Sequence, residues 1–375
     1  MADYPDVLVI GGGVIGLSAA YFLAREGARV EVADQGDFGR EASWAGAGIL
    51  APGNPAAART PLDQLRAHSA TLFPGLSAEL SQRTGIDNGY VRCGGLELAV
   101  AGEEAALDEW RTEGIRFELL DEPAVRDLEP ALAPGLGPAA HLPDLAQVRT
   151  PRHVKALLAG CRCQGVRLHA GCCVQTLEHH GGRVTAVNTG SGPVRADRFL
   201  LATGAWTEPL LAQVGWRPGI RPVRGQIACL NSGVARFRRV LLHGARYLVP
   251  RPDGRVLVGS TEEDAGFDKR TTAGAIGGLL EFALGLIPGL SEAEVEHCWA
   301  GLRPGSPDGQ PFLGPVPGFA NLFLAAGHYR AGIQLSAATG LVLKELLLGQ
   351  ELTVPLESFR LDRQPVPPRR PAFRS

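Results

Sequence analysis

The sequence predicts an α/β protein in which a discontinuous Rossmann-like domain is joined to an α+β domain with a mainly antiparallel sheet. Three observations lead to this fold class. A strand, a glycine-rich turn, a helix and a second strand occupy residues 6–34. Several strands follow one another without helices from residue 222 to 259, and a second glycine-punctuated strand-to-helix junction lies at residues 321–340.

The bulk composition is that of a soluble globular protein. The chain has 375 residues, 45% hydrophobic and 20% charged, with a net charge of -2. This length accommodates one large core or two ordinary domains. The small net charge gives no attraction to nucleic acid or to an anionic membrane, and no apolar run is long enough to cross a bilayer. Because the start shows no secretory signal pattern, the sequence predicts a cytoplasmic protein.

The seven cysteines predict no metal site. Four of them cluster in the sequence: Cys161, Cys163, Cys172 and Cys173. Their CxC and CC spacing differs from the paired CxxC motifs of zinc sites. We therefore expect structural thiols in a reducing compartment, and the sequence leaves the role of this cluster open.

The first βαβ unit carries the strongest motif in the chain. Apolar runs at Val7–Ile10 and Val30–Ala33 predict buried strands, and a helix rich in small residues lies between them. Three glycines with GxGxxG spacing precede that helix: Gly11, Gly13 and Gly16. Such glycines allow a tight turn, close approach of the backbone to a pyrophosphate, and close helix–strand packing. Asp34 ends the second strand, where an acid can hydrogen-bond a ribose hydroxyl.

The residues after this unit predict a loop that touches a bulky ligand. Small residues dominate from residue 42 to 48, and Trp44, Ile49 and Leu50 are too apolar for an exposed flexible loop. Helical spacing follows at residues 60–85, where Ser69 and Ser77 are expected on the helix surface.

The middle of the chain alternates between helices and strands. Prolines between residues 123 and 143 predict a loop-rich stretch or hinge. Further helices are expected at residues 104–113, 151–164 and 273–286, and further strands at residues 91–100, 166–169, 172–177, 184–188, 197–203, 222–230, 240–243, 247–250 and 256–259.

Two features near the C-terminus suggest ligand contacts. Arg303 precedes a Pro-Gly pair that predicts a rigid turn, and a guanidinium held there can grip a carboxylate by two parallel hydrogen bonds. Spacing alone equally allows a structural arginine paired with Asp308. A strand at residues 321–325 then leads into a helix that reaches Leu348, and its N-terminus can place partial positive charge beside an anionic ring.

Two segments carry a resemblance to a known family. GGGVIGLSAAYFLAREG at residues 11–27 and GREASWAGAGILAP at residues 39–52 resemble the FAD-binding start of the D-amino-acid oxidase superfamily. Within it, the chain is most similar to the glycine oxidases of bacterial thiamine biosynthesis, over nearly its whole length. The resemblance implies FAD held non-covalently, because Gly301 stands where sarcosine oxidases often have the flavin-linking cysteine and Cys298 is out of register.

The resemblance assigns roles residue by residue. Asp34 would hold the adenosine ribose, Val174 would lie at the adenine, and the ATGAW turn would contact the pyrophosphate side. Arg303 would clamp the substrate carboxylate, Tyr247 would contact the substrate, and Arg330 would lie near substrate and flavin. The implied cofactor-binding residues are Gly11, Gly13, Val14, Ile15, Gly16, Asp34, Gln35, Ser43, Ala47, Gly48, Ile49, Val174, Gly204, Trp206, His328, Tyr329, Arg330, Ala331, Gly332, Ile333 and Gln334.

The implied reaction is oxidation of glycine, and also of sarcosine or small D-amino acids, by hydride transfer to the flavin. Dioxygen would reoxidise the flavin and give hydrogen peroxide, and the imine would yield glyoxylate and ammonia or pass to the thiazole step of thiamine biosynthesis. Relatives form homotetramers. Three alternatives stay open: a sarcosine oxidase-like enzyme, a D-amino-acid dehydrogenase, and a non-catalytic flavin-binding subunit.

Nucleotide-binding segments at the start, middle and end of the chain predict the domain boundaries. The FAD domain is expected at residues 1–90, 150–218 and 314–364, and the substrate domain at residues 91–149 and 219–313. The Pro- and Arg-rich composition of residues 365–375 predicts a disordered tail.

Overall fold

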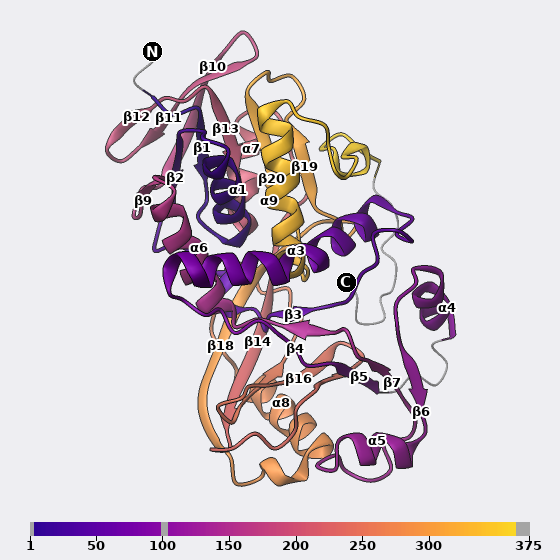
Figure 1. Cartoon of the computed structure of the whole chain (residues 1–375). Coiled ribbons are helices and arrows are strands. Elements are labelled where there is room, and N and C mark those ends of the chain that lie inside the picture. The colour runs from indigo at the N-terminus through magenta and orange to yellow at the C-terminus, as the bar shows by residue number, and fades with distance from the viewer. Residues whose placement is uncertain (1–3, 99–103, 365–375) are drawn as a thin grey trace.

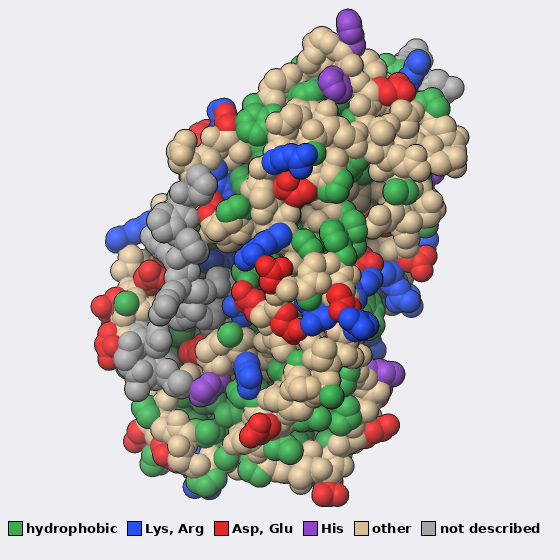
Figure 2. Space-filling model, turned by 180° about the vertical axis from the view of Figure 1, so that it is seen from behind, with side chains coloured by type: hydrophobic (Ala, Val, Ile, Leu, Met, Phe, Trp, Pro, Cys, Tyr) green, Lys and Arg blue, Asp and Glu red, His purple; other side chains and the backbone are tan. Residues whose placement is uncertain are grey.

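The computed structural model describes residues 4–98 and 104–364. The predicted tail at residues 365–375 and the last residues of the strand expected at 91–100 lie outside them. Figure 1 shows two layered halves, with α3 (Pro61–Thr84) lying across the middle between them. No helix in the described part of the chain is long and apolar enough to span a membrane. On the face in Figure 2, positive and negative side chains are intermixed over the middle of the molecule.

A six-stranded sheet forms one half. Its strand order is β19-β20-β13-β1-β2-β9, and all neighbours are parallel except β19 and β20. The bounds are β1 Val7–Ile10, β2 Val30–Ala33, β9 Arg167–His169, β13 Arg198–Leu201, β19 Phe312–Pro315 and β20 Leu322–Ala326. The period of two in a strand sends Val7 and Val9 to one face and Leu8 and Ile10 to the other.

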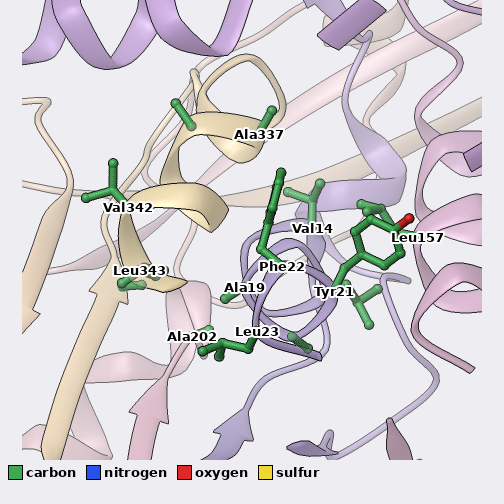
Figure 3. Close-up of a cluster of buried hydrophobic side chains, with 14 of the residues drawn as sticks. Val14, Ala19, Tyr21, Phe22, Leu23, Leu157, Ala202, Ala337, Val342 and Leu343 are labelled. Carbon is green, nitrogen blue, oxygen red and sulfur yellow. The ribbon is translucent and has the colours of Figure 1, made fainter. Parts of the chain in front are cut away.

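Helices cover one face of this sheet. They are α1 (Val14–Arg25), α3, α6 (Thr150–Cys163) and α9 (Gly332–Leu348), with α1 packed against both α6 and α9. Figure 3 shows part of the resulting core, where Phe22 and Tyr21 of α1 point outward among residues of the neighbouring helices. The other face is covered by α7 (Thr207–Ala212) and a small sheet of β10 (Val174–His180), β11 (Arg183–Thr189) and β12 (Gly192–Val194).

An eight-stranded sheet forms the other half. Its order is β18-β14-β17-β16-β15-β5-β7-β6, antiparallel throughout except for the parallel pair β15 and β5. The bounds are β5 Gly95–Leu98, β6 Glu118–Leu120, β7 Ala139–Leu142, β14 Arg221–Asn231, β15 Val240–His243, β16 Arg246–Pro250, β17 Arg255–Gly259 and β18 Glu294–Gly305. Helix α8 (Ala273–Leu286) packs on this sheet through Leu279, Ala283 and Leu286.

Short elements complete the fold. A fourth sheet joins β3 (Ile49–Leu50), β8 (Ala146–Gln147) and β4 (Val91–Arg92), and its strands come from segments on both sides of α3 in sequence. The remaining described elements are α2 (Ala42–Ala45), α4 (Glu104–Thr112), α5 (Glu122–Leu128) and the 3-10 turns Gly204–Trp206, Pro288–Leu290 and Glu357–Phe359.

The proline-rich stretch has neither helix nor strand from residue 129 to 138, as predicted, but its two ends form α5 and β7. Asp121 caps α5 by accepting a hydrogen bond from Ala124 N, and Pro123 sits in the first turn, where its missing N–H costs nothing. Two other expectations from the sequence are wrong. The Pro-Gly pair after Arg303 forms no turn, since β18 continues through Gly305 along β14. Ser69 and Ser77 are buried, because α3 is covered by α6 and α9.

Candidate active site

A cavity of about 330 Å³ runs along the carboxyl ends of the parallel strands. This is the edge at which open α/β sheets bind ligands. The cavity passes from the end of β2, over the N-terminus of α1, to the N-terminus of α9. Its lining includes these predicted residues: Gly11, Gly13, Val14, Ile15, Asp34, Gln35, Ser43, Val174, Gly204, Trp206, Arg303, His328, Tyr329, Arg330, Gly332 and Ile333.

The glycine turn brings backbone donors to the wall of this cavity. Gly11 has φ +108, and a Cβ there would lie 2.4 Å from the carbonyl oxygen of Ala202. A Cβ on Gly16 would lie 1.9 Å from the carbonyl oxygen of Gly11, so Gly16 serves close helix–strand packing and does not line the cavity. Gly13 caps α1 without a side-chain hydrogen bond. The helix therefore presents amides and its positive dipole end to an anionic ligand.

Backbone hydrogen bonds fix the side chain of Asp34, just after the end of β2. Its carboxylate accepts hydrogen bonds from Gly12 N at 2.7 Å and Gly36 N at 2.9 Å. Burial raises the pKa of this carboxyl, and the two backbone hydrogen bonds oppose that shift. Ser43 Oγ accepts a hydrogen bond from Val14 N at 2.9 Å, so α2 is fastened to the start of α1.

The start of α9 forms the far end of the cavity. Its N-cap residue, Ala331, makes no side-chain hydrogen bond to the helix. Ala331 lines neither this cavity nor the smaller one beside it. His328 is buried, and its Nε2 atom lies 3.2 Å from Thr339 Oγ1. Burial lowers the pKa of His328 to about 3. It is therefore neutral at ordinary pH. The Nε2 atom of Gln334 is buried and has no hydrogen-bond partner among the described residues.

A second cavity of about 130 Å³ adjoins the first. It contains five predicted residues that do not line the first: Ala47, Gly48, Ile49, Tyr247 and Gln334. Five residues line both cavities: Ala42, Gly46, Arg303, Arg330 and Ile333. The two predicted arginines therefore lie where a ligand in the small cavity meets a ligand in the long one.

Arg303 is anchored by neutral groups. It reaches across from β18, and its guanidinium donates to Ser260 Oγ at 2.6 Å and to the Thr261 carbonyl oxygen at 3.1 Å. The alternative pairing with Asp308 is wrong, because Asp308 is bound by Arg363 at 2.8 Å. Burial lowers the pKa of Arg303, but a guanidinium remains charged at neutral pH. Its positive charge is thus available to an anion in the cavity.

Tyr247 lies in the same small cavity, on β16. It pairs with Gly259 of β17 across the ladder, and a Cβ on Gly259 would lie 2.4 Å from the tyrosine hydroxyl. The absence of a side chain at Gly259 is what lets the ring lie flat over the strand. Its hydroxyl can hydrogen-bond a small polar ligand.

The segment after β17 supplies residues that sequence reasoning missed. Ser260 and Thr261 hold Arg303, and Glu262 accepts a hydrogen bond from the Tyr329 hydroxyl. Burial, followed by the bond to Glu262, raises the pKa of Tyr329 to about 12. The sequence gives no motif for these residues, because their roles depend on the pairing of β14, β17 and β18.

The cysteine cluster divides in the structure. Cys172 and Cys173 line the long cavity near Val174, whereas Cys161 is buried in α6 and Cys163 is exposed. The described cysteines are free thiols. No group of three or more His, Cys, Asp or Glu side chains within residues 4–98 and 104–364 could hold a metal ion.

These features fit FAD. The start of α1, where Ser43 accepts from the Val14 amide and the N-cap Gly13 has no side chain, suits a pyrophosphate. Asp34 suits a ribose, and the uncapped start of α9 with the unpartnered amide of Gln334 suits a polar ring system. A two-domain fold with a dinucleotide cavity and a small adjoining cavity defines a cofactor-dependent oxidoreductase. The chain belongs to the family of FAD dependent oxidoreductases, which matches residues 6–346, and its cofactor is FAD.

Similar proteins agree with this class. A glycine oxidase from Pseudomonas putida is 40% identical over 348 residues, 92% of this chain and 95% of that protein. The crystal structure of glycine oxidase from Geobacillus kaustophilus matches with a TM-score of 0.91 at 34% identity, covering 97% of this chain and 100% of that one. The bifunctional protein ThiO/ThiG of Synechocystis is 36% identical over 97% of this chain but 54% of its own length. The predicted fold class is confirmed.

Proposed function

We propose that this protein is an FAD-dependent oxidase of glycine that also accepts sarcosine or small D-amino acids. The observation that carries the proposal is the placement of Arg303, a charged guanidinium with neutral partners, where the small cavity meets the long one. A cavity of about 130 Å³ suits a small amino acid. Similarity to glycine oxidases over most of the chain supports the same substrate.

Three residues of the small cavity orient the substrate. Arg303 binds the carboxylate through charge-assisted hydrogen bonds, and Tyr247 contacts the carboxylate or amine through its hydroxyl. Arg330 lies beside both cavities and adds positive charge. FAD held in the long cavity would supply acceptance of a hydride from the substrate carbon and reoxidation by dioxygen with release of hydrogen peroxide. Positioning of this kind can supply much of the rate enhancement without an acid or base.

The imine product would be hydrolysed to glyoxylate and ammonia or passed to thiazole synthesis for thiamine. Support comes from the ThiO/ThiG relative, which joins a segment similar to this chain to a second segment in one polypeptide. A homotetramer and a cytoplasmic location stay predictions. Light scattering of the purified holoprotein measures the first.

The function is tested by a peroxide assay on the FAD-loaded protein with glycine, sarcosine, D-alanine and D-proline in parallel. We expect peroxide with glycine, and loss of turnover in Arg303→Ala while its flavin spectrum stays that of the wild type. A sarcosine oxidase-like enzyme would prefer sarcosine. Flavin that is reduced without peroxide in air would instead identify a dehydrogenase, and flavin reduced by none of these amines would contradict the proposal.

A further inference from the structure

Three arginines line the small cavity, although glycine has one carboxylate: Arg246, Arg303 and Arg330. The guanidinium of Arg246 donates to the Gly278 carbonyl oxygen and lies over the Phe282 ring of α8, which leaves Arg303 and Arg330 to be explained. Arg303 is held only by neutral oxygens in the described structure, those of Ser260 and Thr261, so its charge is open to a substrate carboxylate. Arg330 is placed differently, and its surroundings suggest what the second guanidinium does.

Arg330 faces a carboxylate from the chain itself. Its Nη1 atom lies 3.8 Å from Glu262 Oε2, and its Nη2 atom donates to the Ala245 carbonyl oxygen at 3.3 Å. The other oxygen of Glu262 accepts the Tyr329 hydroxyl, which fixes the direction of the carboxylate. A carboxylate of the chain therefore already lies beside Arg330 before any substrate binds.

The neighbouring glutamate has a separate function. Glu263 is bound by Arg224 at 2.5 Å and by Gln226 Nε2 at 2.8 Å, and it also accepts the Thr261 hydroxyl. It supports β14, the strand beside the one that carries Arg303, and Thr261, whose carbonyl oxygen holds Arg303. Of these two adjacent acids, Glu262 alone makes contacts with Tyr329 and Arg330, which line the cavities.

We propose that Glu262 determines substrate specificity by occupying, next to Arg330, the place that a second substrate carboxylate would take. The site then selects amino acids with a single carboxylate. This inference rests on the proposed function, in which Arg303 binds that carboxylate.

Two effects would select against a second substrate carboxylate: a lost attraction to Arg330 and a repulsion by Glu262. A dicarboxylic amino acid with one carboxylate on Arg303 would find Arg330 already paired, and its second carboxylate would meet the negative charge of Glu262. Because the Glu262 side chain is 47% exposed, water screens part of this repulsion. We therefore expect a graded preference and not complete exclusion.

The first test compares glycine with iminodiacetate, which is glycine carrying a carboxymethyl group on its nitrogen. kcat/KM for both is measured on the FAD-loaded wild type, Glu262→Gln and the control Asp264→Asn. Asp264 lies on the same loop, has a side chain 75% exposed and pairs with Arg221. The ratio for iminodiacetate over glycine should rise about tenfold in Glu262→Gln and stay at the wild-type value in Asp264→Asn. An unchanged ratio in Glu262→Gln, or an equal rise in both variants, would overturn the inference.

A second variant and a binding measurement separate this inference from the proposed function. Adding Arg330→Met to Glu262→Gln should abolish the gain for iminodiacetate. Binding of malonate and acetate, followed by the flavin absorbance, needs no turnover, and the malonate preference should rise in Glu262→Gln. If the wild type oxidises no amine, the proposed function fails, while the malonate-to-acetate ratio still decides the role of Glu262. A ratio equal to that of the wild type would contradict it.

Discussion

Gly225 and Arg303 lie on neighbouring strands, and the guanidinium of Arg303 fills the space that a side chain on Gly225 would need. A Cβ built on Gly225 would lie 2.3 Å from Nη1 and Nη2 of Arg303. The two residues sit diagonally across the ladder, since Arg303 pairs with Val223 and Gly225 with Gly301. The strand pairing of the second sheet thus sets the position of the proposed carboxylate clamp.

Gly225→Ala should weaken glycine binding by displacing that guanidinium. We expect the KM for glycine to rise about tenfold or more, with kcat changing less, because the lost contact is a charge-assisted hydrogen bond worth about 1.5–3 kcal/mol. Steady-state kinetics on the FAD-loaded protein measure this. Gly277→Ala is the control, since nothing lies within 4 Å of a Cβ there; in helix α8 it should keep KM and raise stability. A KM equal to that of the wild type in Gly225→Ala would contradict the arrangement.

Asp34→Asn should weaken FAD binding. Removing the charge weakens hydrogen bonds to a ribose, so we expect an increase in the Kd for FAD of about tenfold, measured by titrating the apoprotein and following flavin fluorescence. Asp37→Asn removes the same charge from an exposed residue on the wall of the same cavity. An equal increase in the Kd for FAD in both variants would mean that FAD binding weakens through loss of charge at the cavity, and it would contradict a specific contact by Asp34.

Stability should fall in mild acid because of His153. This residue is buried, its Nδ1 lies 3.1 Å from Asn88 Nδ2, and burial lowers its pKa from 6.5 to about 4. A folded-state pKa below the unfolded value means that the unfolded chain takes up the proton first. Stability is therefore full above pH 6.5 and falls, by about 3 kcal/mol in total, as the pH drops toward 4.

Urea unfolding at a series of pH values tests this prediction. His153→Gln should flatten the dependence in that window whatever its effect on absolute stability, whereas His180→Gln, at an exposed hairpin end, should not. If the free energy of unfolding falls equally with pH in the wild type and in His153→Gln, His153 is not the source of the acid dependence.

Arg363→Met should destabilise the fold. Arg363 and Asp308 form an ion pair with side chains 6% and 2% exposed, and the guanidinium stacks 3.7 Å from the centre of the Phe312 ring. Removing one partner leaves a buried charge, which costs about 3–5 kcal/mol. Arg360→Met removes an exposed pair with Asp362 and should cost less than about 1 kcal/mol. Thermal unfolding of both variants checks the difference, and similar midpoints would contradict a structural role for Arg363.

Local patterns predicted the first βαβ unit, which carries the proposed cofactor-binding turn. The turn at Gly11 and the acid at Asp34 belong to one continuous βαβ unit, so their spacing in sequence already specifies their spacing in the fold. The burial of Ser69 was not predictable in this way. Its hydroxyl contacts Ala338 N of α9, a residue far away in the chain, and only the packing of the two helices brings them together.

The substrate side was predicted only in part. Arg303 and Tyr247 followed from the resemblance, but their supports did not. Ser260 and Glu262 have no local motif, and they meet Arg303, Tyr329 and Arg330 because separate strands and the start of α9 converge at the cavity. Arg303 was also expected before a turn, since a Pro-Gly pair is a turn signal unless a neighbouring strand overrides it.

Anaerobic mixing of the FAD-loaded protein with glycine tests the central claim most directly. The flavin absorbance of the wild type should bleach rapidly and recover on admission of air with release of hydrogen peroxide. Arg303→Ala should keep its bound flavin and bleach at least a hundredfold more slowly at the same glycine concentration, because both hydrogen bonds to the carboxylate are lost. Bleaching of Arg303→Ala at the wild-type rate, or a wild-type flavin that glycine does not reduce, would contradict the account.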